Sequence, residues 1–342
     1  MSLHPSAHSL SAFVLAAVVG LGACKSPTSP QPDTKPWTPG TTLIPASASK
    51  PIAVESAGPR KRNGTEIVIA GELVPIGVPV VLWSDPGGYN AYGRTRERES
   101  FTPGRPTSPG PLSGRDRVPR SRTPEVVRQA VDQFVLHYDV CGVSRECFKV
   151  LEARGLSVHF LLDIDGTLYQ TLDLAESAWH AREANGRSIG VEIANIGAYP
   201  AGSTELATWY GRDGRGTRIT VPPFLRGGGV RTAGFIGRPA RAHKLRGRIN
   251  GQTLEQYDFT PQQYETLAHL TAALVNSFPN MPLRFPTDGS GGIRPDVLSK
   301  AEFERYRGIL GHQHVSSGKT DPGPSFNWSA LSRRARQLLG AP

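Results

Sequence analysis

The stretch SVHFLLDIDGTLYQTL, residues 157–172, is typical of a β-hairpin. Runs of apolar and β-branched residues flank the pair Asp165-Gly166, and Asp-Gly in that context is a strong signal for a tight turn. Residues 132–138 and 188–195 form further short apolar runs on either side in the chain. We therefore predict that these segments form β-strands.

Helical patterns accompany the strands. Residues 144–151 favour a helix, with Ser144 as its N-cap. The capping box Thr260-Pro261-Gln262-Gln263, with proline at the first helical position, predicts a helix that runs to about Phe278. A last helix is expected after Trp328. Mixed strands and helices of this kind indicate an α/β fold.

The first sixty residues have the features of an exported lipoprotein. The apolar run 13–21 is too short to span a bilayer comfortably and is typical of a signal-peptide core. It ends in Leu21-Gly22-Ala23-Cys24, which resembles the lipobox of bacterial lipoproteins, where the cysteine is lipidated. The proline-rich residues that follow cannot bury enough surface to fold. We expect a signal peptide over 1–23, a lipidated Cys24 with a tether over 24–59, and a folded domain over 60–342.

This N-terminus also predicts a location. Acyl chains on Cys24 would anchor the protein stably in a membrane. Position 25 is Lys rather than the Asp that resembles an inner-membrane retention signal, so we expect an outer-membrane lipoprotein that faces the periplasm. Because that compartment is oxidising, Cys141 and Cys147 are predicted to form a disulfide. A metal site built on these two thiols would need more ligands than their segment contains.

The formal net charge is +10, with basic residues dense over 94–122 and 226–248. No helix-turn-helix, RNP or zinc-finger pattern accompanies this charge, so we expect no nucleic-acid partner. Attraction to an anionic polymer of the cell envelope is the simpler interpretation.

The stretch GHQHVSSGKTDPGP, residues 311–324, has a catalytic composition. Its two imidazoles, one lysine and one carboxylate could hold a divalent metal and stabilise charge on a reacting amide. A surface loop with incidental histidines is the alternative. Two upstream residues supply matching pieces: His137 ends a predicted strand, and Glu192 lies among apolar neighbours, where a carboxylate is costly unless it is paired or its pKa is used.

Five segments in this order resemble the zinc-dependent N-acetylmuramoyl-L-alanine amidases related to peptidoglycan-recognition proteins, especially their outer-membrane lipoprotein members. The resemblance covers about residues 130–335. It implies a mixed central β-sheet flanked by helices, with one zinc ion in a surface groove. The segments are Phe134-Val135-Leu136-His137-Tyr138, Gly155-Leu156-Ser157-Val158-His159-Phe160, Ala178-Trp179-His180-Ala181, Asn185 with Ser188-Ile189-Gly190-Val191-Glu192, and Gly311-His312 with Lys319-Thr320-Asp321-Pro322-Gly323-Pro324.

The resemblance assigns roles by position. It implies that His137, His312 and Asp321 are the zinc ligands. Glu192 is then the general base and Lys319 the residue that stabilises the oxyanion. Position 158 is Val where some relatives carry a catalytic Tyr, which leaves Glu192 as the strong candidate for the base.

Other residues near these segments receive supporting roles. His159 is expected to be structural or to support the metal ligands from behind. Trp179, His180 and Asn185 are expected to contact substrate, with His180 in the groove wall, and His314 to face solvent.

The expected function is hydrolysis of the amide between N-acetylmuramic acid and L-alanine, in peptidoglycan or its fragments, by a monomer. A non-catalytic peptidoglycan-binding module and a zinc peptidase that acts on the stem peptide are the alternatives. Within the domain, residues 60–125 are an N-terminal extension with predicted strands at 66–70 and 80–83. Residues 198–256 are an insertion that lies near the substrate cleft or forms a surface lobe.

Overall fold

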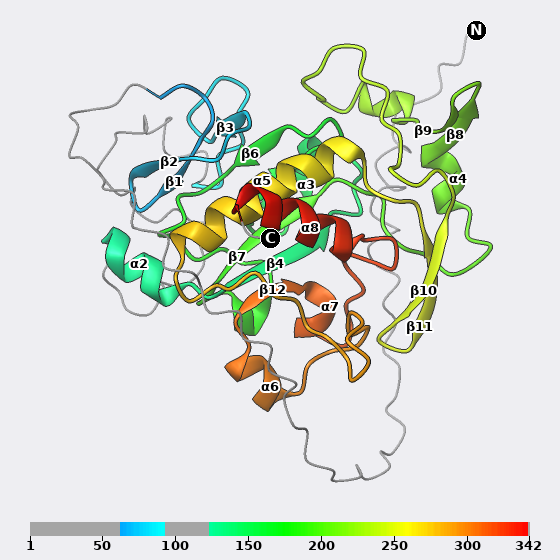
Figure 1. Ribbon diagram of the computed structural model, residues 1–342. Coiled ribbons are helices and arrows are strands. Elements are labelled where there is room, and N and C mark those ends of the chain that lie inside the picture. The colour runs from blue at the N-terminus through cyan, green and yellow to red at the C-terminus, as the bar shows by residue number, and fades with distance from the viewer. Residues whose placement is uncertain (1–61, 93–122, 341–342) are drawn as a thin grey trace, which may run out of the picture. The chain divides into compact units, whose positions relative to one another are not determined.

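The computed structural model of the protein describes residues 62–92 and 123–340 (Figure 1). The predicted signal peptide, Cys24 and the tether over 24–59 lie outside the described residues. So does the basic segment 94–122. None of the helices in the described ranges is long and apolar enough to cross a membrane.

A six-stranded mixed sheet forms the centre of the fold, in the order β12-β4-β7-β5-β6-β3. Strands β12, β4, β7 and β5 run parallel to one another, whereas β6 is antiparallel to β5 and parallel to β3. The arrangement confirms the predicted α/β fold and the hairpin across Asp165-Gly166. The strands are β3 (Val80–Leu82), β4 (Gln133–Tyr138), β5 (Phe160–Leu162), β6 (Leu168–Gln170), β7 (Ser188–Ile193) and β12 (Gly308–Gly311).

Helices cover this sheet on both faces. Helices α5 (Pro261–Ser277) and α8 (Trp328–Leu338) pack against each other and share the largest apolar cluster with the sheet. Helix α3 (Ser144–Ala153) contacts β5 and β7 and packs in a separate cluster. The predicted capping box at Thr260 is confirmed, because its side chain accepts from Gln263 N–H and the Gln263 side chain accepts from Thr260 N–H.

Alternation along the strands decides which side chains meet each set of helices. On β4, Phe134 and Leu136 belong to the cluster under α5, whereas Val135 belongs to a cluster on the opposite side. On β7, Ile189, Val191 and Ile193 all face the α5 side. His137 and Glu192 therefore project from the opposite face, next to each other.

The N-terminal extension adds to the sheet. β1 (Glu66–Ile69) and β2 (Glu72–Pro75) form an antiparallel hairpin, and β3 becomes the edge strand beside β6. Every residue of β1 is buried, which shows that the extension is part of the core. The apolar runs at 66–70 and 80–83 predicted β1 and β3, whereas β2 was not predicted.

The insertion folds into two hairpins. β8 (Tyr210–Asp213) pairs with β9 (Gly216–Ile219), and β10 (Leu245–Ile249) pairs with β11 (Gln252–Gln256). The remaining elements are short: α2 (Pro124–Ala130), α4 (Glu205–Trp209), α6 (Lys300–Arg305), α7 (His312–Val315) and 3₁₀ turns at Arg182–Ala184 and Pro223–Leu225.

Two local predictions are wrong in this structure. Val143 is the N-cap of α3, and the Ser144 hydroxyl lies inside the helix without a hydrogen-bond partner among the described residues. Cys141 and Cys147 are both free cysteines, so the predicted disulfide is not formed. The two thiols nevertheless interact, because the hydrogen bond to Cys141, together with burial, raises the pKa of the Cys147 thiol.

Candidate metal centre

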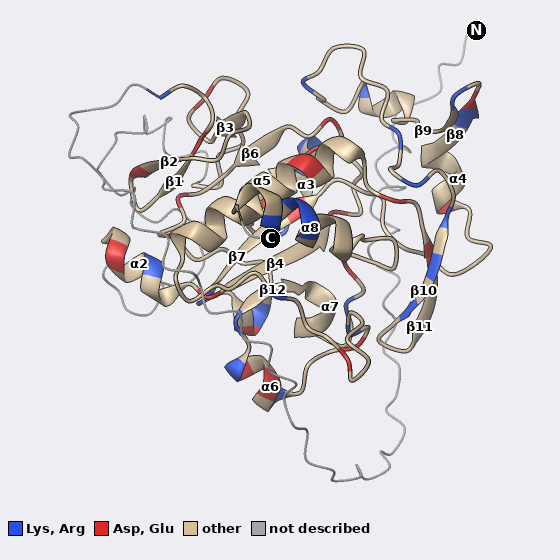
Figure 2. Ribbon diagram, viewed as in Figure 1, with Lys and Arg blue, Asp and Glu red and all other residues tan. Residues whose placement is uncertain are grey.

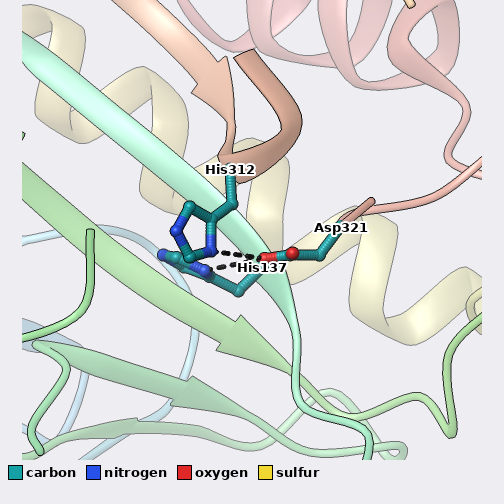
Figure 3. Close-up of side chains that lie close together, drawn as sticks. All are labelled: His137, His312 and Asp321. Carbon is teal, nitrogen blue, oxygen red and sulfur yellow. Dashed lines mark hydrogen bonds and ion pairs between the residues drawn. The ribbon is translucent and has the colours of Figure 1, made fainter. Parts of the chain in front are cut away.

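Three ligand-type side chains converge at one edge of the sheet (Figure 3). His137 lies near the end of β4, and His312 follows directly after β12. Because β12 and β4 are parallel neighbours with Gly311 opposite Leu136, these two histidines are brought side by side. Asp321 reaches them from the loop after α7. One candidate ligand atom from each residue lies within 4.8 Å of the other two.

One carboxylate oxygen of Asp321 lies within hydrogen-bond distance of both histidines. Asp321 Oδ2 lies 2.8 Å from His137 Nδ1 and 3.0 Å from His312 Nδ1. Burial lowers the pKa of His137 to about 4, and the neighbouring His312 adds to this effect. Burial alone would raise the pKa of Asp321, but His312 and His137 outweigh it and hold that pKa below its usual value. His137 is therefore a neutral imidazole and Asp321 an ionised carboxylate, the forms in which these side chains bind metal.

This donor set fits a zinc ion. Two histidine nitrogens and one carboxylate oxygen are typical of catalytic zinc sites, which keep a further position open. The second nitrogen of His137 also has a hydrogen-bond partner that can orient the ring, since Nε2 lies 3.0 Å from His180 Nδ1. With Nδ1 as the ligand atom, Nε2 carries the proton and donates it to His180.

Glu192 lies beside the cluster on β7. It pairs directly with His137 across the two parallel strands, and its Oε1 is 4.0 Å from His137 Nδ1. Burial raises the pKa of Glu192 well above its usual value, and the carboxylates of Asp321 and Asp139 raise it further, whereas Lys319 opposes them. Its Oε2 is buried and accepts no hydrogen bond from residues 62–92 and 123–340. Such a carboxylate can take up a proton.

Lys319 and Trp179 form the exposed part of the site. Lys319 lies on the loop between His312 and Asp321, and its charge acts on both His137 and Glu192. The Trp179 residue is 42% exposed and directly precedes His180. A large exposed aromatic beside a candidate catalytic site is suited to substrate contact.

His180 occupies space that a missing side chain leaves open. A Cβ atom at Gly190 would lie only 2.5 Å from His180 Nδ1. Ser188, two residues earlier on the same face of β7, places its hydroxyl 3.2 Å from His180 Nε2. The histidine predicted for the groove wall is thus held directly against His137.

The remaining predicted residues have structural partners. His159 is fully buried, accepts from Gly190 N–H and reaches the carbonyl of Glu176 with its other nitrogen, so it supports the site from behind. Asn185 Oδ1 accepts from the backbone N–H groups of His180 and Ala181, so this side chain shapes the turn that carries His180.

The prediction for His314 is wrong. It is fully buried, its Nδ1 accepts from Gly311 N–H at 2.9 Å, and its Nε2 lies 2.7 Å from the Arg294 carbonyl. Residues 312–315 form a helical turn, in which His312 and His314 lie on different faces.

Several residues bind the loop over residues 313–325, the metal-site loop, and were not predicted from the sequence. The Tyr138 hydroxyl bonds to Thr320, directly before Asp321. Asn250 and Gln256, both from the insertion, bond to the backbone of residues 313–325. One available signal was Asn250-Gly251, an Asn-Gly pair of the kind that favours a two-residue hairpin turn.

Comparison with known proteins gives a family. Residues 127–324, more than half of the chain, match the family described as N-acetylmuramoyl-L-alanine amidase. No curated protein sequence matches the chain significantly.

Similar solved structures have low sequence identity. A selenomethionine derivative of AmpD is 18% identical, with a TM-score of 0.31, over 66% of this chain and 92% of that chain. LysC, an N-acetylmuramoyl-L-alanine amidase from Clostridium intestinale URNW, is 15% identical, with a TM-score of 0.32, over 63% of this chain and 89% of that chain. AmiD from E. coli, in complex with an anhydro-N-acetylmuramic acid peptide, is 16% identical, with a TM-score of 0.35, over 64% of this chain and 61% of that chain. By the match over residues 127–324, the chain belongs to the N-acetylmuramoyl-L-alanine amidase family.

Proposed function

We propose that this protein is a zinc-dependent hydrolase that cleaves the amide between N-acetylmuramic acid and L-alanine in peptidoglycan or its fragments. One observation carries the proposal: in a chain of this family, His137, His312 and Asp321 converge within 4.8 Å, with the partly buried carboxylate of Glu192 beside them. One zinc ion per chain would be held by these three side chains. Bound there, zinc lowers the pKa of water and polarises a carbonyl group.

Glu192 is the proposed general base. It takes a proton from the attacking water, and the water oxygen bonds to the carbonyl carbon of the lactyl group. The bond from that carbon to the alanine nitrogen then breaks, and the nitrogen receives the proton that Glu192 took. The raised pKa of Glu192 favours the first of these transfers, because it makes the carboxylate a stronger base toward the attacking water.

Two further side chains act on the substrate in this proposal. The Lys319 ammonium group stabilises negative charge as it develops on the carbonyl oxygen, which is the usual role of a cation placed beside a reacting amide. Trp179 supplies an exposed apolar surface against which a sugar or peptide can pack.

The proposal extends to location. The lipobox-like sequence at Cys24 and the proline-rich tether support anchoring in the outer membrane with the domain in the periplasm, where peptidoglycan is within reach.

Zinc content and turnover, measured on the same preparations, test the function. His137→Ala should lose zinc and activity together, because two ligands hold the metal weakly. Glu192→Gln should keep near-stoichiometric zinc and lose turnover by roughly 10²–10⁴-fold, since it removes the base and leaves the ligands. His243→Ala, which changes an exposed histidine outside the cluster, is the control and should resemble the wild type.

Full activity in Glu192→Gln would contradict the mechanism. Full activity in zinc-free protein, prepared with a chelator and verified by metal analysis, would contradict the zinc dependence.

A further inference from the structure

The tip of the β10–β11 hairpin touches the loop that carries the candidate metal ligands (Figure 1). Asn250 Nδ2 donates to three backbone carbonyls of that loop: Lys319 at 2.7 Å, Gln313 at 3.0 Å and Ser316 at 3.3 Å. Its Oδ1 accepts from Val297 N–H at 2.8 Å. The Asn250 side chain therefore connects the backbone at Val297 to the backbone at residues 313, 316 and 319, between His312 and Asp321.

A second contact from the same hairpin lies just beyond Asp321. Gln256, fully buried, donates through Nε2 to the Pro322 carbonyl at 3.1 Å, and its Oε1 accepts from Ser325 N–H at 3.1 Å. A Cβ atom at Gly323 would lie only 2.0 Å from Gln256 Oε1, so this approach requires glycine. The hairpin thus contacts the loop on both sides of Lys319 and Asp321.

The backbone at the tip is built to present this amide. Asn250 and Gly251 form the two-residue connection between β10 and β11, with φ of 45° and 81°. Positive φ at both positions is typical of a hairpin turn in which asparagine followed by glycine is favoured. Asparagine is among the few residues with a side chain that adopt this conformation readily, and its amide supplies the donor that the three carbonyls need.

We propose that the β10–β11 hairpin positions the metal-site loop, with Asn250 as the positioning residue. The backbone carbonyls of residues 313, 316 and 319 all accept from the Asn250 side-chain amide. These bonds fix the backbone between His312 and Asp321, and with it the position of Lys319. The insertion over 198–256 then helps to position the candidate active site. The catalytic consequence rests on the proposed function, whereas the ordering of the loop does not.

Asn250→Asp is the sharpest test. Aspartate has the same size, tolerates positive φ and suits the same turn, so the hairpin should persist. Its carboxylate cannot donate to three carbonyls and repels them. Asn250→Gly removes the side chain without backbone strain, and this variant replaces Asn250→Asp in the test if the aspartate variant does not fold. Asn280→Asp is the matched control, because Asn280 Nδ2 also donates to a backbone carbonyl, that of Gln129, away from the loop.

Three measurements on the full-length protein separate positioning from general stability. Backbone amide hydrogen exchange over residues 313–321 should become faster in both Asn250 variants. Zinc affinity, measured by competition with a chelating dye, should fall by about 10–100-fold, the usual effect of losing a group that supports metal ligands. Turnover number should fall while KM changes little, because the loop holds the reacting groups. Asn280→Asp should leave all three measurements as in the wild type.

Unchanged exchange over 313–321 in both Asn250 variants would overturn the inference. Faster exchange with unchanged zinc affinity would overturn it as well, because the loop would then be ordered without positioning the ligands. If the wild type cleaves no peptidoglycan but exchange and zinc affinity respond as expected, the positioning role stands and the proposed function fails.

Discussion

Gly190 shows how a single residue shapes the candidate site. It lies on β7 between Ser188 and Glu192, on the face that carries the site, and has no side chain there. The ring of His180 fills that space and reaches His137 Nε2. A residue without any reactive group thus determines where a partner of the metal ligand lies.

Gly190→Ala should therefore impair the site. The added Cβ would lie 2.5 Å from His180 Nδ1, far closer than van der Waals contact, so the ring must move away from His137. We expect zinc affinity or turnover to fall by about 10–100-fold, as when the hydrogen-bond partner of a ligating histidine is lost. Gly186→Ala is the matched control, because a Cβ there meets no atom within 4 Å. If both variants retain wild-type zinc affinity and turnover, His180 has no supporting role.

Asp163 gives a prediction about pH. Burial raises the pKa of this carboxyl group to about 7, from about 3.9 in an unfolded chain. Its Oδ1 accepts from Ser144 and Ile164 N–H, but its Oδ2 has no hydrogen-bond partner among the described residues. Between pH 4 and pH 7 the folded state therefore keeps a proton that the unfolded state has released, so this group contributes less stability as pH rises.

Asp163→Asn should remove that dependence. Asparagine has the same shape and does not ionise, so the free energy of unfolding of the variant, relative to the wild type, should increase as pH rises from about 4 to about 7 and then level off. Urea unfolding of both proteins at several pH values measures this difference. A difference that stays constant across the range would show that Asp163 titrates normally.

At the scale of single elements, the sequence was sufficient to predict those helices and turns whose geometry is set by residues close together in the chain. The capping box at Thr260 fixed the start of α5, because both of its hydrogen bonds join residues three apart. Asp165-Gly166 likewise located the β5–β6 hairpin, whose turn geometry is set by two residues.

Elements held by distant contacts were harder to predict. The hairpin of β10 and β11 lies in a Gly- and Arg-rich segment, and its strands carry few apolar side chains, those of Leu245, Ile249 and Leu254, so the sequence signal for a strand is weak. His314 was expected in solvent because the sequence does not reveal its bonds to Gly311 and Arg294. The choice of His137, His312 and Asp321 came from family resemblance. Five histidines were candidates, and only the pairing of β4 with β12 brings 137 and 312 together.

At the scale of the whole molecule, the insertion that carries much of the positive charge also contacts the metal-site loop. The insertion over 198–256 holds ten Lys and Arg residues against three Asp and Glu, a large share of the formal net charge of +10. Several of these cations lie along the β8–β9 and β10–β11 hairpins (Figure 2). The hairpin that carries Arg246 and Arg248 also holds the metal-site loop through Asn250. A cationic surface beside the site would favour approach of an anionic polymer such as peptidoglycan, with its carboxylate-bearing stem peptides.

Mass spectrometry of purified muropeptides after incubation with the zinc-loaded protein tests the central claim most directly, because the mass of the released peptide identifies the bond that was cut. Glu192→Gln, loaded with zinc in the same way, is the control for contaminating hydrolases. We predict a peptide that begins with a free L-alanine amino group and a sugar whose lactyl group ends in a carboxylate, together heavier than the substrate by one water. Cleavage within the stem peptide, with the lactyl–alanine amide intact, or binding without cleavage, would contradict the account.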